Sequence, residues 1–290
     1  MSLADVTAWF DSPFVRIVGI DCRHPRGGCG CERGGERTHL ALLRRGGFGY
    51  HLRGAEYVGD PATALLYRAG DSYRISHPFD GGDACTCFEV APEHEEELFG
   101  RRLRDGADAA RTVEPAAQFR HRMLHAALVR GDHDRLATEE RAATLCQDIL
   151  QRGQQGDTAS PLSAAARRLA RRTREALLAD PATDAGLAAL SSLVGCSPFH
   201  LARVFRRAYG MSLATCRTRL RLALALDRLG EGADDLSALA CDLGFSHHSH
   251  FGAAFRRHVG LTPAAARTAL RDASQARLRR DLIAAPATGR

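Results

Sequence analysis

Six cysteine and histidine side chains in the first 90 residues have the chemistry to bind a metal ion. They are Cys22, His24, Cys29, Cys31, Cys85 and Cys87. Each consecutive pair is spaced i, i+2, which in a β-strand places both side chains on one face. Thiolate and imidazole donors suit zinc or another thiophilic metal in tetrahedral geometry. These six residues are therefore the candidate metal ligands of the chain.

Other interpretations of these cysteines stay open, because the C-x-C spacing differs from the C-x₂-C spacing of structural zinc sites. Cys85 and Cys87 can be small core residues, and Cys29 and Cys31 can lie in a Gly-rich loop. The thiols can also act as a thiol sensor, or the effector of this region can be an organic molecule. The sequence leaves the cofactor unknown, with zinc or another thiophilic metal as the candidate.

Paired arginines recur about 50 residues apart between Leu187 and Thr262, within a larger repeat. Each copy has a short apolar-periodic helix, a Gly that permits a sharp turn, a Ser suited to cap the next helix, and a second helix with an Arg pair. These residues are Leu187, Leu190, Val194, Gly195, Ser197, Arg206 and Arg207 in the first copy, and Leu236, Leu239, Leu243, Gly244, Ser246, Arg256 and Arg257 in the second. The repeat predicts two helix-turn-helix units.

Charge is divided unequally along the chain. All 40 basic residues are Arg, and the net charge is +10 from Leu162 onward but −4 over the preceding 161 residues. A basic segment attached to a mildly acidic one is typical of a nucleic-acid-binding module joined to another domain. A helical solenoid, the alternative for a repeat, needs three or more units. We therefore expect the C-terminal half to bind duplex DNA.

Two segments of the repeat resemble the AraC/XylS family of transcription regulators. They are GCSPFHLARVFRRAYG at 195–210 and DLGFSHHSHFGAAFRRHVGLTP at 242–263, and the similarity extends over residues 164–267. The resemblance implies a C-terminal all-α double helix-turn-helix domain and an N-terminal cupin-like β-barrel or jelly roll that senses an effector. It also implies promoter DNA and RNA polymerase as partners. The expected fold class is a multidomain α+β protein.

The second helix of each unit is the expected DNA-reading helix, at 198–209 and from about 247 to 259. A helical period turns Leu201, Val204, Phe205 and Ala208 inward in the first unit, and Phe251, Phe255 and Val259 inward in the second. The outward positions and the resemblance give the candidate DNA contacts: Phe199, Ala202, Arg203, Arg206, Arg207, His248, Ser249, Gly252, Ala253, Arg256 and Arg257.

These candidate contacts predict unequal roles for the two units. Arg203 is the candidate for a guanine contact, because its guanidinium can donate two hydrogen bonds to one base. The equivalent position in the second unit is Ala253, so this unit should read bases weakly or mainly anchor phosphates. Packing within the unit is the alternative for Phe199. In the connecting helix, expected at 214–229, we expect Arg217, Arg219 and Arg221 to be solvated or to face phosphates.

The N-terminal region alternates short β-type segments with Gly- or Asp-containing turns, at 14–20, 38–43, 48–52, 64–67, 73–77 and 85–90. Helical patterns follow at 93–104, 115–129 and 135–152. The expected domains are a sensor at 1–110, a helical hairpin at 111–152, a linker at 153–161, a DNA-binding domain at 162–272 and a basic tail at 273–290. The hairpin is expected to form a homodimer, and the alternative is that it closes the open side of the barrel.

Compartment and reaction class can also be predicted. The nine cysteines are an odd number, no 18-residue apolar run occurs, and the first five residues lack a basic and apolar leader. We therefore expect a cytoplasmic protein with reduced thiols and no membrane association. A cupin-type metal-dependent enzyme is the alternative function, but it needs a facial set of His and carboxylate ligands. No suitably spaced His pair accompanies His77, so we expect no catalytic residues.

Overall fold

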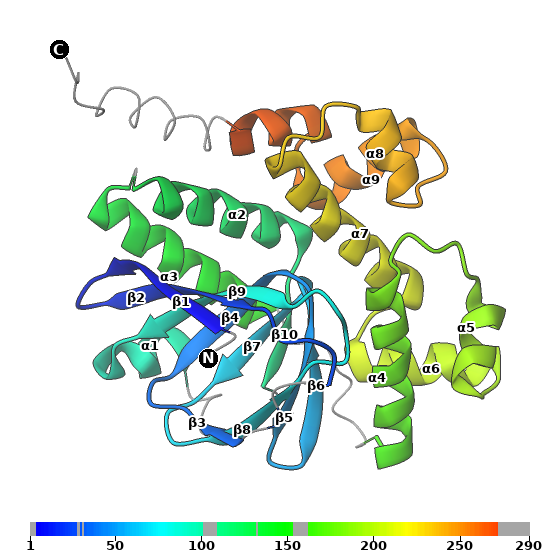
Figure 1. Cartoon of the computed structure of the whole chain (residues 1–290), viewed down its shortest axis with the longest axis horizontal. Helices are drawn as coiled ribbons and strands as arrows, with labels where there is room; N and C mark the ends of the chain where they lie inside the picture. Colours follow the sequence, from blue (N-terminus) through cyan, green and yellow to red (C-terminus); the bar gives the residue numbers. More distant parts are fainter. Residues whose placement is uncertain are drawn as a thin grey trace.

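Two antiparallel sheets make up the N-terminal region of the computed structural model, which describes residues 4–27, 30, 32–100, 109–131, 133–152 and 162–271. The larger sheet has the order β1 (Ala4–Asp11), β2 (Val15–Cys22), β9 (Asp83–Val90), β4 (His39–Arg45), β7 (Thr63–Tyr67) and β10 (Ala110–Thr112). The smaller sheet has the order β3 (Glu32–Gly34), β8 (Ser72–Ser76), β5 (Phe48–Leu52) and β6 (Ala55–Gly59). Helices make up the rest of the described chain (Figure 1). The expected α+β fold class is confirmed.

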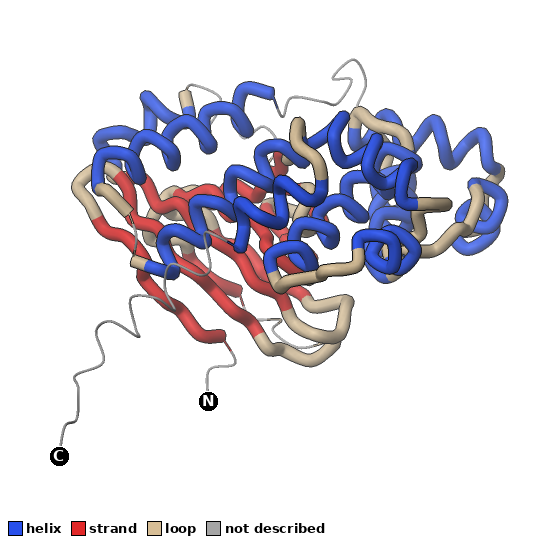
Figure 2. The backbone as a smooth tube through the Cα atoms, turned by 90° about the horizontal axis from the view of Figure 1, so that it is seen from above, coloured by secondary structure: helices blue, strands red, loops and turns tan. Residues whose placement is uncertain are grey.

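The strands of the larger sheet have apolar side chains on both faces, because each face is covered. Val18, Leu65 and Cys87 point toward the smaller sheet and join Tyr50 in the barrel interior. The alternate residues, such as Ile17 and Phe88, pack against the hairpin of α2 (Pro115–Arg130) and α3 (Arg135–Arg152). A short 3₁₀ turn (Pro92–His94) and α1 (Glu95–Phe99) connect β9 to this layer. Figure 2 shows the strands gathered in one part of the molecule, with helices packed against and beside them.

The C-terminal half contains α4 (Ala164–Ala179), α5 (Leu187–Val194), α6 (Pro198–Tyr209), α7 (Leu213–Gly230), α8 (Leu236–Asp242) and α9 (His248–Val259), and residues 263–271 are also helical. Gly195 ends α5 in the left-handed conformation (φ 75°), and Ser197 accepts a hydrogen bond from the His200 backbone N–H. In the second unit the cap of α9 is His247, not Ser246. The prediction that a serine caps the second helix of each unit is therefore correct for Ser197 and wrong for Ser246. The turn of the second unit carries one more residue, which moves the cap to His247.

Several elements were not expected from the sequence. The strands β1, β3, β6 and β10 are additional, and the helix expected at 93–104 begins as a 3₁₀ turn and ends at Phe99. β10 pairs with β7 and lies across the domain boundary expected between residues 110 and 111. The expected linker at 153–161 and tail at 273–290 lie outside the described residues. In the described part of the chain, no individual helix has the length and apolar character to cross a membrane, although α5 and α6 together pass on these two criteria with an 85° bend between them.

The hairpin contacts the C-terminal helical half directly. Phe119 and Met123 of α2 pack against the apolar core of α7, α8 and α9. Arg122 of α2 forms an ion pair with Asp227 of α7, and Glu114 accepts a hydrogen bond from Arg219 at 2.5 Å. Both faces of α2 are thus occupied within one chain, since its other side covers the large sheet (Figure 1).

Candidate nucleic-acid interface and sensor cavity

The α6 helix has a buried apolar face and an exposed polar face. Leu201, Val204 and Phe205 are buried in the core of the first unit, as their helical spacing predicts. The five candidate contacts are all exposed: Phe199, Ala202, Arg203, Arg206 and Arg207. Phe199 is 89% exposed, so it does not pack within the unit. Arg203 lies one helical turn after His200, whose Nδ1 is 3.4 Å from the guanidinium.

The α9 helix repeats this arrangement with different exposed residues. Phe251, Phe255 and Val259 are buried, which confirms the expected inward face. The candidate contacts His248, Ser249, Ala253, Arg256 and Arg257 are exposed, and Gly252 is half-buried. The position that corresponds to Arg203 therefore presents only a methyl group to the surface. Ser246 bonds to the His250 ring at 3.0 Å, which fixes the turn before the helix.

The arginines of α7 have a structural role that was not expected. Arg219 is buried and binds Glu114. Arg221 donates hydrogen bonds to the carbonyl groups of Pro181, Ala182, Thr183 and Gly244, and Arg217 donates to Ala185 at 2.5 Å. The expectation that these three side chains are solvated or face phosphates is wrong. Arg217 and Arg221 bind carbonyl oxygens of the loops beside α7, and Arg221 joins the loop before α5 to the turn after α8. Arg219 instead connects α7 to Glu114 at the start of α2.

A cavity of about 80 Å³ lies in the N-terminal region, between the two sheets. Its aromatic and apolar lining includes Phe48, Tyr67, Tyr73 and Ile75, and its polar lining includes Cys22, His39, His77, Asp83, Cys85 and Cys87. Space of this size suits a small ligand or a few water molecules. Four of the six candidate metal-ligand positions can be placed in or beside it.

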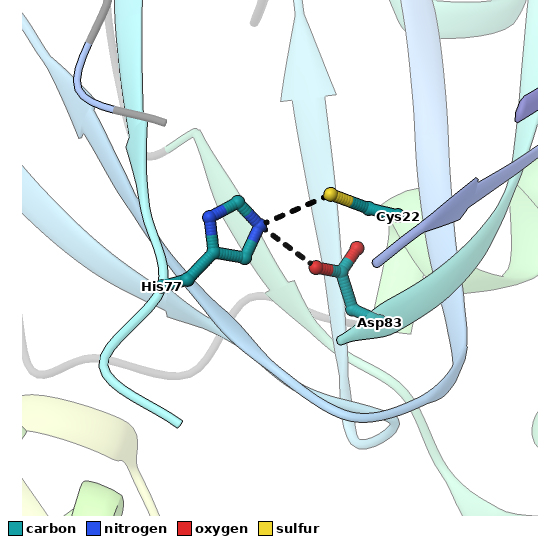
Figure 3. A group of neighbouring side chains, drawn as sticks. All are labelled: Cys22, His77 and Asp83. Atoms are coloured by element: carbon teal, nitrogen blue, oxygen red, sulfur yellow. Dashed lines mark hydrogen bonds and ion pairs between the residues drawn. The ribbon is translucent and has the colours of Figure 1, made fainter. Parts of the chain in front are cut away.

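Three buried polar side chains that line this cavity, Cys22, His77 and Asp83, point toward one another (Figure 3). The Nε2 atom of His77 is 3.4 Å from the Cys22 Sγ atom and 3.0 Å from the Asp83 Oδ2 atom. One ligand atom from each residue lies within 4.8 Å of the other two. Cys22 and Asp83 are register partners on β2 and β9, and His77 follows β8. The structure thus brings together side chains from two adjacent strands and from the loop after β8.

The other candidate ligands lie nearby in different roles. The His24 ring stacks on the His77 ring, with centroids 5.4 Å apart and an interplanar angle of 24°. Cys85 and Cys87 are buried on the same face of β9 as Asp83. A hydrogen bond with Cys87 and burial raise the pKa of the Cys85 thiol well above its ordinary value. Cys29 and Cys31 lie outside the described residues.

Asp83 was missed by the sequence analysis, although a signal for it exists. Asp83, Cys85 and Cys87 alternate along one strand, and residues at i, i+2 and i+4 share a face of a sheet. A carboxylate on the same face as two buried thiols is unusual and predicts a compensating partner. The missing information was which strands lie next to each other: His77 falls at the end of the expected segment 73–77, but no local pattern shows that it meets Cys22 and Asp83.

Comparison with known proteins gives one match that covers most of the C-terminal half: residues 190–269 match a family model described as a helix-turn-helix domain. The chain carries an AraC-type helix-turn-helix domain. It is therefore a DNA-binding transcription regulator, and the expected family resemblance is confirmed. The AraC-type domain starts within α5 and extends to the helical residues that follow α9. No curated protein matches the chain in sequence.

Solved structures similar to this chain have low sequence identity to it. ToxT from Vibrio cholerae is 9% identical over 92% of this chain and 98% of that chain, with a TM-score of 0.35. The C-terminal domain of AraT, a response regulator from Geobacillus stearothermophilus, is 23% identical over 38% of this chain and 88% of that chain, with a TM-score of 0.33. The cupin domain of Cnp3 from Schizosaccharomyces pombe is 9% identical over 33% of this chain and 71% of that chain, with a TM-score of 0.29.

Proposed function

We propose that this regulator places α6 and α9 in successive major grooves of promoter DNA. The observation that carries the proposal is the exposed polar face of each helix, backed by a buried apolar face. The connecting helix α7 has 18 residues, which at about 1.5 Å rise per residue corresponds to roughly 27 Å. Successive major grooves on one side of a duplex are about 34 Å apart, so helices near the two ends of α7 can reach both.

The two units should contribute unequally to base recognition. Arg203 is exposed on α6 and can donate two hydrogen bonds to guanine. Ala253 occupies the corresponding place on α9 and cannot donate any. Arg206, Arg207, Arg256 and Arg257 follow near the ends of the helices, where phosphate contacts would fix the register without reading sequence. His248 and Ser249 supply the remaining polar contacts of α9.

An effector bound in the cavity of the N-terminal region would lie close to residues that contact the first helix-turn-helix unit. A Cβ atom at Gly47 would meet Leu178 of α4 at 2.5 Å and Phe79 at 3.4 Å. The missing side chain at Gly47 thus allows α4 to approach the loop that follows His77. Ala62 of the sensor is part of the apolar core that contains Leu201 and Phe205 of α6. These contacts support a regulator whose DNA affinity depends on the state of the cavity.

Catalysis is not part of this proposal. In a nucleophile–base–acid triad, the imidazole uses one ring nitrogen for the nucleophile and the other for the carboxylate. Here Cys22 and Asp83 both approach the Nε2 atom of His77. Recruitment of RNA polymerase and homodimerisation through the hairpin remain predictions. Because α2 packs within the chain on two sides, the outer face of α3 would have to supply the dimer contact, and sedimentation of the purified protein tests this.

The test of DNA recognition uses the full chain, because α4 depends on contacts with the sensor. Duplexes selected in vitro from random sequence should bind more tightly than scrambled duplexes, and affinity should fall steeply as salt rises. Arg203→Ala should cost about 1–3 kcal/mol for the selected duplex and relax the preference at one base pair. Arg257→Ala should weaken all duplexes alike, and Arg37→Ala in the sensor is the matched control. Equal affinity for selected and scrambled duplexes would refute sequence-specific regulation.

A further inference from the structure

The cluster of Cys22, His77 and Asp83 has the composition and spacing of a metal site. In a tetrahedral zinc site with Zn–S of about 2.3 Å and Zn–N or Zn–O of about 2.0–2.1 Å, neighbouring donor atoms lie roughly 3.3–3.6 Å apart. The measured separations are 3.4 Å for Sγ to Nε2 and 3.0 Å for Nε2 to Oδ2. Small side-chain movements would therefore suffice to enclose a cation between the three atoms. We propose that Cys22, His77 and Asp83 bind a thiophilic divalent cation of the zinc class.

The Cys22 sulfur and an Asp83 carboxylate oxygen both approach the same ring nitrogen of His77. A neutral imidazole carries at most one proton on Nε2, and that proton can point well at only one of Cys22 Sγ and Asp83 Oδ2. A cation at the centre would satisfy the sulfur, the nitrogen and the carboxylate together. The arrangement also gives a thiolate, an imidazole and a carboxylate, which is a donor set that favours zinc over magnesium or calcium.

Burial strengthens the case for a cation. Cys22, His77 and Asp83 are 8%, 3% and 3% exposed, respectively. A buried carboxylate is costly unless a positive charge compensates it. Within the part of the chain that the structure describes, His77 is the ion-pair partner of Asp83. A divalent cation would compensate the charges of both the carboxylate and a Cys22 thiolate, whereas a protonated His77 supplies only one positive charge.

The backbone around the cluster allows β2 to approach the start of β9 closely. Cys22 and Asp83 face each other in register across β2 and β9. Gly82 precedes Asp83 in the left-handed conformation (φ 70°), and a Cβ atom there would overlap the Cys22 carbonyl oxygen. The carbonyl of His77 accepts a hydrogen bond from the Gly27 N–H at 2.9 Å. These constraints hold the three donors in place before any ligand binds.

The fourth coordination position is expected to face the cavity. All three ligands line the cavity of about 80 Å³, and zinc sites with three protein ligands keep one position for water or another small ligand. His24 stacks on the His77 ring and is not among the residues whose ligand atoms meet in the cluster. A small donor molecule in the cavity would therefore complete the coordination. Its effect on DNA binding rests on the proposed function, whereas metal binding does not.

Metal binding can be measured on the full-length protein without DNA. Chelator-treated, reduced protein is titrated with Co²⁺ and then with Zn²⁺ in competition with a chromophoric chelator. We expect one metal per chain and a thiolate-to-cobalt charge-transfer absorption. Cys22→Ser should abolish this absorption and weaken zinc binding by about 100-fold or more, because losing even an outer-shell partner costs roughly 10–100-fold. Asp83→Asn preserves the shape of the side chain and should also weaken zinc binding, without loss of the fold by circular dichroism.

Two matched controls separate this site from the other thiols. Cys87→Ala removes a thiol from the same cavity, and Cys241→Ser removes an exposed thiol. Both variants should bind one metal with unchanged affinity. The proposal is overturned if folded Cys22→Ser and Asp83→Asn bind metal as the wild type does. It is also overturned if the Cys29→Ser, Cys31→Ser double variant alone loses the metal. Either result leaves the DNA-binding test untouched.

Discussion

Asp60 and Arg174 form a buried bidentate ion pair between the β-rich N-terminal region and α4 of the C-terminal half. Arg174 donates from Nε to Asp60 Oδ2 at 2.6 Å and from Nη2 to Asp60 Oδ1 at 2.9 Å. Asp60 also accepts hydrogen bonds from the Ala62 backbone N–H and the Thr63 hydroxyl. The guanidinium stacks on Tyr209 at the end of α6, with its carbon 4.7 Å from the ring centroid. This pair therefore connects the β6–β7 turn to the recognition helix.

Breaking this ion pair should destabilise the whole chain. Asp60→Asn leaves the Arg174 charge buried without its counter-charge, and we expect a loss of about 3–5 kcal/mol in the free energy of unfolding. Urea denaturation measures the change. The double variant Asp60→Asn, Arg174→Met should be less destabilised than the sum of the two single variants, because no charge remains buried. A loss below about 1 kcal/mol for Asp60→Asn would show that water reaches the pair, as it does for exposed ion pairs.

Stability should fall as the pH is lowered below 6.5, because His125 of α2 is held neutral. Burial, followed by the charges of Arg44 and Arg122, lowers the pKa of His125 to about 3. Arg44 also donates a hydrogen bond to its Nε2 atom at 3.1 Å. The unfolded chain, with an ordinary histidine pKa of 6.5, takes up this proton first. The native state therefore loses about 1.4 kcal/mol per pH unit below 6.5 for this residue.

The measurement is urea denaturation at pH 7.5, 6.5 and 5.0. We expect about 2 kcal/mol less stability at pH 5.0 than at pH 7.5 from His125. His121 adds to the same trend, since burial lowers its pKa well below the ordinary value. His125→Gln should remove the contribution of His125 and flatten the profile. An identical slope in this variant would contradict the assignment.

The sequence predicted the regular parts of this fold but few of its interactions. Helical periodicity predicted α5 and α6 with their observed ends, because the spacing of the buried residues and the Gly after each helix can be read from nearby sequence. β6, in the smaller sheet, was not predicted because its polar and apolar residues do not alternate clearly along the strand. Arg219 and Arg221 look like solvated side chains in the sequence, since their acceptors come from residues far away in the chain. The partner of Cys22 is likewise set by strand register, which no local pattern contains.

Substitution at Ala253 should give the second unit a base preference. Ala253 is exposed on α9 at the place of Arg203 on α6. Ala253→Arg supplies a guanidinium that can bind guanine through two hydrogen bonds, which is worth about 1–3 kcal/mol of discrimination. In vitro selection should then show one additional conserved base pair in the half-site contacted by α9. Wild-type selections with equal information in both half-sites would contradict unequal reading by the two units.

Two adjacent glycines allow the geometry of the proposed metal site to be tested separately from backbone strain. Gly81 and Gly82 both have positive φ angles, of 92° and 70°. An added Cβ atom meets nothing within 4 Å at Gly81, but at Gly82 it overlaps the Cys22 carbonyl oxygen. Both Gly→Ala changes should cost about 1–3 kcal/mol through the unfavourable φ angle. Gly82→Ala alone should also push Asp83 away from Cys22 and weaken zinc binding at least tenfold, as competition with a chelator would show. If folded Gly81→Ala and Gly82→Ala bind zinc equally well, the close contact between Gly82 and the Cys22 carbonyl group does not position the metal ligands.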